Sequence, residues 1–175
     1  MTSAKGAHAV EAIYADYQAL VDEVAASPSG LSAVNRIYNK HLLVAAASSL
    51  EDFVKDSVPA IFSRQGNERI GTFISKQVFV RGYHTLFDWK NQTAQPFFAS
   101  FGVECATAFK AAVRADEELK TEHDAFMLLG LLRNEVVHND FASKSIAHTP
   151  AEVIGKYRSG LLFVGRFENL VTLGS

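Results

Sequence analysis

Apolar residues recur every three or four positions over most of this chain, which is the spacing of one helix face. The first such segment runs from residue 7 to residue 26 and ends at a Ser-Pro-Ser-Gly sequence. The second runs from about residue 32 to residue 62. Within it, Pro59 lacks a backbone donor, so we expect a kink or a restart near Ser57. Both segments are predicted to be amphipathic helices.

The middle of the chain has two shorter helical patterns, at residues 68–80 and 103–115, with an irregular segment between them. That segment, residues 82–101, has no clean period but is rich in Phe, Tyr and Trp. Such aromatic side chains stack on single-stranded bases or, more often, fix an irregular segment to the core. In the first case, His84 and Lys90 would make it an RNA-facing flap.

A charged stretch and a capped helix complete the pattern. Residues 116–124 are expected to be solvated, with His123 at the surface, and they lead into an apolar run at residues 125–132. Residues 149–152 read Thr-Pro-Ala-Glu, a capping box with Pro at the first helical position, which predicts a final helix. Strand-like alternation and internal repeats are absent from the sequence. We therefore predict a single all-α domain, a bundle of about five helices with an irregular aromatic-rich segment.

Composition excludes several classes of protein. Hydrophobic content of 48% and charged content of 21% over 175 residues are ordinary for one globular domain. One cysteine, Cys105, excludes an internal disulfide framework, and no apolar run is long enough for a membrane span. Residues 1–6 lead into an amphipathic segment instead of a continuous apolar one, so we expect no signal peptide. We expect a cytoplasmic protein without a membrane partner. The net charge of −2 gives no general attraction to nucleic acid, so RNA binding would need a local basic patch.

The apolar run ends in a compact polar set, Arg133, Asn134 and His138. A segment that is apolar on nearly all sides belongs in a core or an interface, where Arg and His are rare unless something pairs with them. Asn134 and His138 share one helix face, whereas Arg133 points roughly 140° away from His138. The three side chains converge only if the helix is distorted, if Arg133 curls back, or if two copies of the motif meet across a dimer axis.

The sequence Leu-Arg-Asn-Glu-Val-Val-His at residues 132–138 resembles the signature of the HEPN superfamily. In that signature an Arg is followed, after four to six residues, by a His, often with a polar residue next to the Arg. The helical organisation of the chain resembles the same superfamily. The resemblance implies a HEPN-like bundle and a metal-independent endoribonuclease that acts on RNA as a homodimer. HEPN proteins similar to this one serve as toxins or antiphage-defence effectors, which implies a cognate antitoxin or another defence-system partner.

The motif residues suit RNA cleavage without a metal or another cofactor. A His exchanges protons near neutral pH, and Asn139 and Asp140 form a stop signal that places His138 in the last helical turn, where the helix dipole favours its charged form. Arg133 would hold the phosphate in the transition state, and Asn134 would orient the phosphate or fix the His tautomer. The ribose 2′-hydroxyl would then attack the adjacent phosphate, leaving a 2′,3′-cyclic phosphate and a 5′-hydroxyl.

Two acidic residues, Glu51 and Asp140, are predicted to support the catalytic set. Glu51 lies inside the apolar stripe of the second helix. It is therefore either an edge residue that reaches solvent or an ion-pair partner of Arg133. HEPN proteins often have an acidic residue on this helix, so the resemblance favours the second alternative. Basic residues that follow the motif are candidates for RNA binding: Lys144, Lys156, Arg158 and Arg166.

Other functions stay open beside this prediction. A metal site is disfavoured because none of the six histidines lies three or four residues from another. The absence of a Gly-rich phosphate loop or a Gly-rich serine elbow disfavours an NTPase or a serine hydrolase. The main alternative is a non-catalytic HEPN-fold interaction or RNA-binding module, and a third is a small-ligand sensor in which Arg133 holds an anion. Without the resemblance, a structural role of Arg133 and His138 at a helix end would explain the motif.

Overall fold

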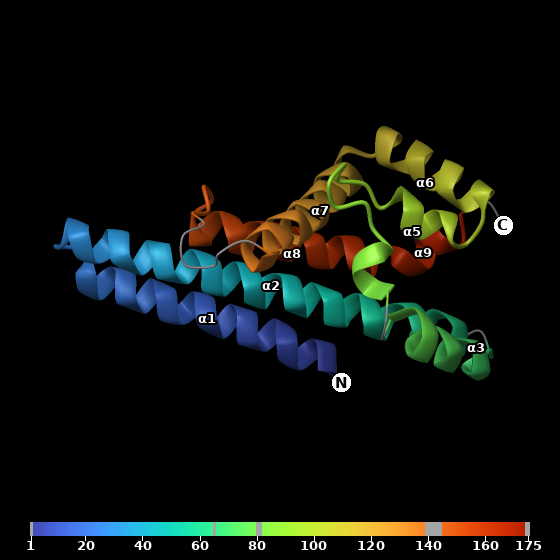
Figure 1. Ribbon diagram of the computed structural model, residues 1–175, viewed down its shortest axis with the longest axis horizontal. Coiled ribbons are helices and arrows are strands. Elements are labelled where there is room, and N and C mark those ends of the chain that lie inside the picture. Colours follow the sequence, from blue (N-terminus) through green and yellow to red (C-terminus); the bar gives the residue numbers. More distant parts are fainter. Residues whose placement is uncertain (1, 65, 80–81, 139–144, 174–175) are drawn as a thin grey trace.

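The computed structural model describes residues 2–64, 66–79, 82–138 and 145–173, and the α-helices in these ranges fall into two groups (Figure 1). The long helices are α1 (Thr2–Val24), α2 (Pro28–Arg64), α6 (Val103–Ala115), α7 (Glu117–His138) and α8 (Pro150–Gly165). The short helices are α3 (Glu68–Phe73), α5 (Gln95–Ala99) and α9 (Phe167–Val171). The predicted all-α fold is confirmed. The predicted number of about five helices agrees with the long helices, but the prediction did not include all of the short ones.

Helix α2 is the central element of the bundle. It packs against α1 on one side and against α7 and α8 on the other (Figure 1). Pro59 lies inside α2, which continues to Arg64, so the expected restart near Ser57 does not occur. Val58 and Ile61, on either side of Pro59, are almost completely buried. Burying two such side chains contributes about 3–6 kcal/mol, which exceeds the roughly 3 kcal/mol that a proline costs inside a helix.

The segments that the sequence presented as short helices differ in how regular they are. The predicted helix at 103–115 is found as α6, with bounds Val103–Ala115. The predicted helix at 68–80 is found, up to Phe79, as α3 followed by the π-helical segment η1 (Ile74–Phe79). Gly71 allows α3 to fold back onto α2, because a Cβ at this position would lie 2.7 Å from the carbonyl oxygen of Pro59.

The aromatic-rich segment is fixed to the core, which confirms the commoner of the two alternatives. It contains the 3₁₀ helix η2 (Tyr83–Thr85) and an isolated bridge between Asp88 and Thr93. The side chains of Phe87 and Trp89 are buried, and their ring centroids lie 5.0 Å apart. Phe87 also packs edge-on against Phe126 of α7, at 5.2 Å. These contacts attach the segment to α7.

The charged stretch at residues 116–124 forms, from Glu117, the first part of α7. Glu117, Glu118, Lys120 and Asp124 are exposed as predicted, whereas Glu122 is buried. His123, expected at the surface, has a side chain that is only 7% exposed. Its Nε2 accepts a hydrogen bond from the backbone N–H of Ala94 at 3.2 Å, and its Nδ1 lies 2.8 Å from the carboxylate of Asp124. The expectation was wrong because a segment 29 residues away supplies the donor that a buried imidazole needs.

The capping box at the start of α8 is confirmed. The backbone N–H of Glu152 donates to the Thr149 hydroxyl at 3.2 Å, and the backbone N–H of Thr149 donates to the Glu152 carboxylate at 2.7 Å. Further along α8, Gly160 allows a close approach to α2 and α7, since a Cβ there would lie 3.1 Å from the side chain of Leu50. Among the described residues, none of the helices combines the length and the hydrophobicity of a membrane span.

Candidate active site

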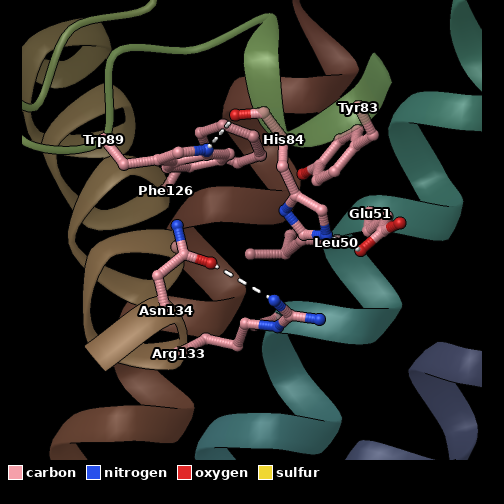
Figure 2. Close-up of a pocket in the computed structure, with 10 residues that line it drawn as sticks. Leu50, Glu51, Tyr83, His84, Trp89, Phe126, Arg133 and Asn134 are labelled. Atoms are coloured by element: carbon pink, nitrogen blue, oxygen red, sulfur yellow. Dashed lines mark hydrogen bonds and ion pairs between the residues drawn. The ribbon is translucent and has the colours of Figure 1, made fainter. Parts of the chain in front are cut away.

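Arg133 and Asn134 face a narrow pocket between α2, α7 and the segment around η2 (Figure 2). We call it the Arg133 pocket; its lining residues are Ala47, Leu50, Glu51, Tyr83, His84, Trp89, Phe126, Gly130, Arg133 and Asn134. Its cavity volume is ≈ 10 Å³, which is about the room that one water molecule needs. A polymer such as RNA would therefore lie across the mouth of the pocket and reach its polar groups from outside.

Helix α7 delivers the two motif residues from a well-anchored position. Leu129, one turn earlier, and Phe126, two turns earlier, are fully buried and fix the helix against the core. Arg133 and Asn134 are half-buried, and Nη1 of Arg133 donates a hydrogen bond to Oδ1 of Asn134 at 3.2 Å. This bond uses only one of the five guanidinium N–H donors. The pocket thus brings together two of the three predicted catalytic residues.

Glu51 reaches the Arg133 pocket from α2, with a side chain that is 18% exposed. Among the described residues its ion-pair partners are Lys55, at 2.5 Å, and His84, whose Nε2 lies 3.8 Å from the carboxylate. The predicted ion pair between Glu51 and Arg133 is therefore wrong. Lys55 is four residues further along the same helix and reaches the carboxylate directly. Glu51 and Arg133 share the pocket without forming an ion pair.

His84 enters the same pocket from η2, a placement that the sequence pattern did not reveal. Its imidazole lies between the Glu51 carboxylate and the side chains that come from α7 (Figure 2). Partial burial is the main cause that holds the pKa of His84 below its usual value. The positive charge of Arg133 lowers this pKa further, whereas the negative charge of Glu51 raises it. The neutral imidazole is therefore favoured at neutral pH.

Trp89 fixes the backbone that carries His84. Its indole Nε1 donates a hydrogen bond to the carbonyl oxygen of His84 at 3.0 Å (Figure 2). The indole ring lies directly on α7 at Gly130, where a Cβ would be only 2.0 Å from the ring carbon Cζ3. A side chain at this position of α7 would push the ring away. Gly130 therefore allows Trp89, and with it His84, to approach Arg133.

His138 is the last residue of α7 and is exposed. His138 lies one turn beyond Asn134 on the same helix, and it is not among the residues that line the Arg133 pocket. The divergence of Arg133 and His138 that the helix geometry predicted is thus present within one chain. The charge of His138 nevertheless acts on His84, where it lowers the pKa of the imidazole together with Lys55.

The family of the chain follows from a comparison with protein-family models. The model described as RiboL-PSP-HEPN matches residues 12–172, a range that includes α2, the Arg133 pocket and the motif of α7. The chain belongs to the RiboL-PSP-HEPN family. The resemblance to the HEPN superfamily that the motif suggested is confirmed. Comparisons with curated proteins and with solved structures found no match.

The described basic candidates for RNA binding in this RiboL-PSP-HEPN protein are not among the residues that line the Arg133 pocket. Arg158 of α8 forms two bonds, at 2.7 and 2.9 Å, to the carboxylate of Glu11 in α1. Arg166 lies 2.6 Å from the buried carboxylate of Glu122. These carboxylates offset the charge that a basic patch would need. Lys156 lines a separate, wider groove between α7 and α8.

Two of the predicted site residues, Asp140 and Lys144, lie outside the described residues. Within the described ranges, this RiboL-PSP-HEPN protein brings Arg133, Asn134 and Glu51 together and adds His84. No three His, Cys, Asp or Glu side chains of that part of the chain are arranged so that they could hold a metal ion. The polar groups available to a ligand at this site are therefore imidazole, guanidinium, amide and carboxylate.

Proposed function

We propose that this HEPN protein is a metal-independent endoribonuclease with Arg133, Asn134 and His138 as its catalytic residues. The observation that carries the proposal is the half-buried side chain of Arg133, which lines the pocket. Within the described part of the chain, no carboxylate lies within ion-pair distance of it. Desolvating a charge without neutralising it is costly, and a phosphate bound across the pocket mouth would supply the missing negative charge.

The proposed reaction needs no cofactor. Arg133 binds the non-bridging oxygens of the scissile phosphate, where negative charge develops in the transition state. Asn134 holds the guanidinium through its Oδ1 and offers its amide N–H groups to the same phosphate. His138, at the end of α7, exchanges a proton with the reacting oxygens. The 2′-oxygen bonds to phosphorus, the bond to the 5′-oxygen breaks, and the products carry a 2′,3′-cyclic phosphate and a 5′-hydroxyl.

The proposed active unit is a homodimer in which the two motif regions face each other. Because Arg133 and His138 diverge on α7, one copy surrounds a phosphate poorly, whereas two copies around a two-fold axis place both residue types around one groove. The dimer also brings two Arg133 charges together on a chain with a net charge of −2. The family resemblance extends the proposal to a toxin or antiphage-defence effector, controlled by a partner encoded nearby.

A cleavage assay in EDTA with single variants tests the catalytic assignment. We expect the wild-type protein to cut RNA in EDTA and His138→Ala and Arg133→Ala to lose about 10²- to 10⁴-fold in rate. Circular dichroism should show the same helix content in each variant. The matched controls are His41→Ala and Arg114→Ala, which alter exposed residues outside the Arg133 pocket. Undiminished cleavage by His138→Ala would contradict the assignment.

A second function, binding of RNA or a protein partner without cleavage, is favoured by the exposed position of His138 outside the pocket lining. The same EDTA assay separates the two functions when it is combined with an RNA-binding measurement. A catalytic site predicts binding and product formation. A binding module predicts a mobility shift that depends on Arg133 and no product.

A further inference from the structure

We propose that His84 is a second catalytic histidine of the Arg133 pocket, oriented by Glu51, and that it accepts the proton of the ribose 2′-hydroxyl. This inference rests on the proposed ribonuclease function. It adds to that function a residue that lies 49 positions before Arg133 and outside the Arg-Asn-x₃-His motif. It also divides the acid and base roles between two histidines.

The geometry around His84 is that of a histidine backed by a carboxylate. Nε2 of His84 lies 3.8 Å from Oε2 of Glu51, within ion-pair reach though longer than a hydrogen bond. The side chain of His84 is 47% exposed, so the ring is open to a ligand while Glu51 lies behind it. With Nε2 turned toward the carboxylate, Nδ1 is left to accept a proton from the substrate. The carboxylate stabilises the imidazolium that then forms.

The position of His84 is fixed by the packing of its neighbours in the core. A glycine inside a helix costs roughly 1 kcal/mol relative to alanine, and α7 has one at Gly130. The space that it leaves is filled by Trp89, which holds the carbonyl of His84. Tyr83 packs edge-on against the imidazole, with ring centroids 5.3 Å apart. His84 is thus partly exposed but held from both sides.

Partial burial, together with charged groups on two helices, sets the protonation of His84. Glu51 and Lys55 face it from α2, and Arg133 and His138 act on it from α7. Because burial and the three cations outweigh Glu51, the pKa of His84 is lowered and the ring is neutral at neutral pH, as a general base must be. His138, exposed at the end of α7, takes the opposite role in this scheme, the donation of a proton.

These roles balance the reaction. The 2′-oxygen forms a bond to phosphorus as its proton moves to Nδ1 of His84. The bond between phosphorus and the 5′-oxygen breaks as His138 gives its proton to that oxygen. His84 ends protonated and His138 neutral, and exchange with water restores both. No oxidant, metal or further reactant is required.

The first test compares RNA cleavage by His84→Ala, His84→Gln and the control His41→Ala. We expect the two His84 variants to keep their helix content and to lose about 100-fold or more in kcat, with partial recovery of His84→Ala in added imidazole. If the wild-type protein and His84→Ala cut equally well, the inference is overturned while the proposed function stands. If the wild-type protein does not cut RNA at all, both are overturned.

The second test changes the charges beside His84 and measures the pH dependence of kcat/KM, which a purely structural role of His84 would not alter. Glu51→Gln removes the charge that raises the pKa of His84, so the acidic limb of the kcat/KM profile should move to lower pH. Lys55→Gln removes a charge that lowers this pKa, so the limb should move to higher pH. An NMR titration of the His84 ring in the free protein should show both shifts. The inference would be contradicted if the His84 imidazole titrates with the expected shifts while the acidic limb of the kcat/KM profile does not move.

Discussion

Replacing Gly130 with alanine should destabilise the protein, although alanine is the better helix former by about 1 kcal/mol. The new Cβ would lie 2.0 and 2.3 Å from two ring carbons of Trp89, so the indole has to move. Overpacking of this kind costs about 2 kcal/mol, the lost hydrogen bond to the His84 carbonyl about 1 kcal/mol, and partial exposure of the indole about 1 kcal/mol. After the gain in helix propensity, we expect a net loss of about 3 kcal/mol.

Urea unfolding followed by circular dichroism and by fluorescence measures this loss. Trp89 is the only tryptophan of the chain, so its emission reports directly on the displaced ring. A loss of about 3 kcal/mol corresponds to a fall in Tm of roughly 6–12 °C for a protein of this size. Gly155→Ala on α8 is the matched control, because no atom lies within 4 Å of its added Cβ. Equal stability of the two variants, with unchanged emission, would refute the reasoning.

Three further predictions concern stability. Glu122→Ala should lower the free energy of unfolding by about 2 kcal/mol in urea unfolding, because Arg166 loses its buried partner but keeps the carboxylates of Asp116 and Glu118. Glu168→Ala, in an exposed ion pair, should change it by less than about 1 kcal/mol in the same assay. Thr149→Ala should cost about 1 kcal/mol through loss of the cap of α8, seen in the same assay. Because the pKa of folded His84 is lowered, the unfolded chain binds a proton first as the pH falls below about 6.5. Stability should therefore decline below that pH, and His84→Gln should flatten the decline in urea titrations at several pH values.

The helical pattern predicted most of the fold because helix faces and caps are local properties of a sequence. The bounds of α6 and the capping box of α8 follow from residues within a few positions of one another. The burial of His123 does not, because the backbone N–H that satisfies its ring belongs to Ala94, in another segment. Residues that look solvated by composition are buried when a distant segment supplies their hydrogen bonds.

In the candidate site, too, the residues set by local sequence could be predicted and those set by tertiary contacts could not. Its motif residues, Arg133 and Asn134, could be found because a polar pair interrupts an apolar helix. The inward placement of Glu51 also followed from helix geometry, but its ion-pair partner did not, since Lys55 on the same helix competes with any tertiary partner. His84 lies in a segment without a period, and tertiary packing, including that of Trp89 on Gly130, brings it to the pocket. The one glycine inside the α7 sequence, Gly130, and the one tryptophan of the chain, Trp89, are only a weak sequence signal that the two residues pack together.

The proposed reaction depends on the ribose 2′-hydroxyl, and one measurement tests that dependence directly. The protein is incubated in EDTA with an RNA oligonucleotide and with the same oligonucleotide carrying a 2′-deoxyribose at the mapped cleavage position, and the products are analysed by mass spectrometry. The account predicts that the RNA is cut to a 2′,3′-cyclic phosphate and a 5′-hydroxyl and that the 2′-deoxy substrate is not cut at that position. Cutting of both substrates, products with a 5′-phosphate, or no cutting of either would contradict it.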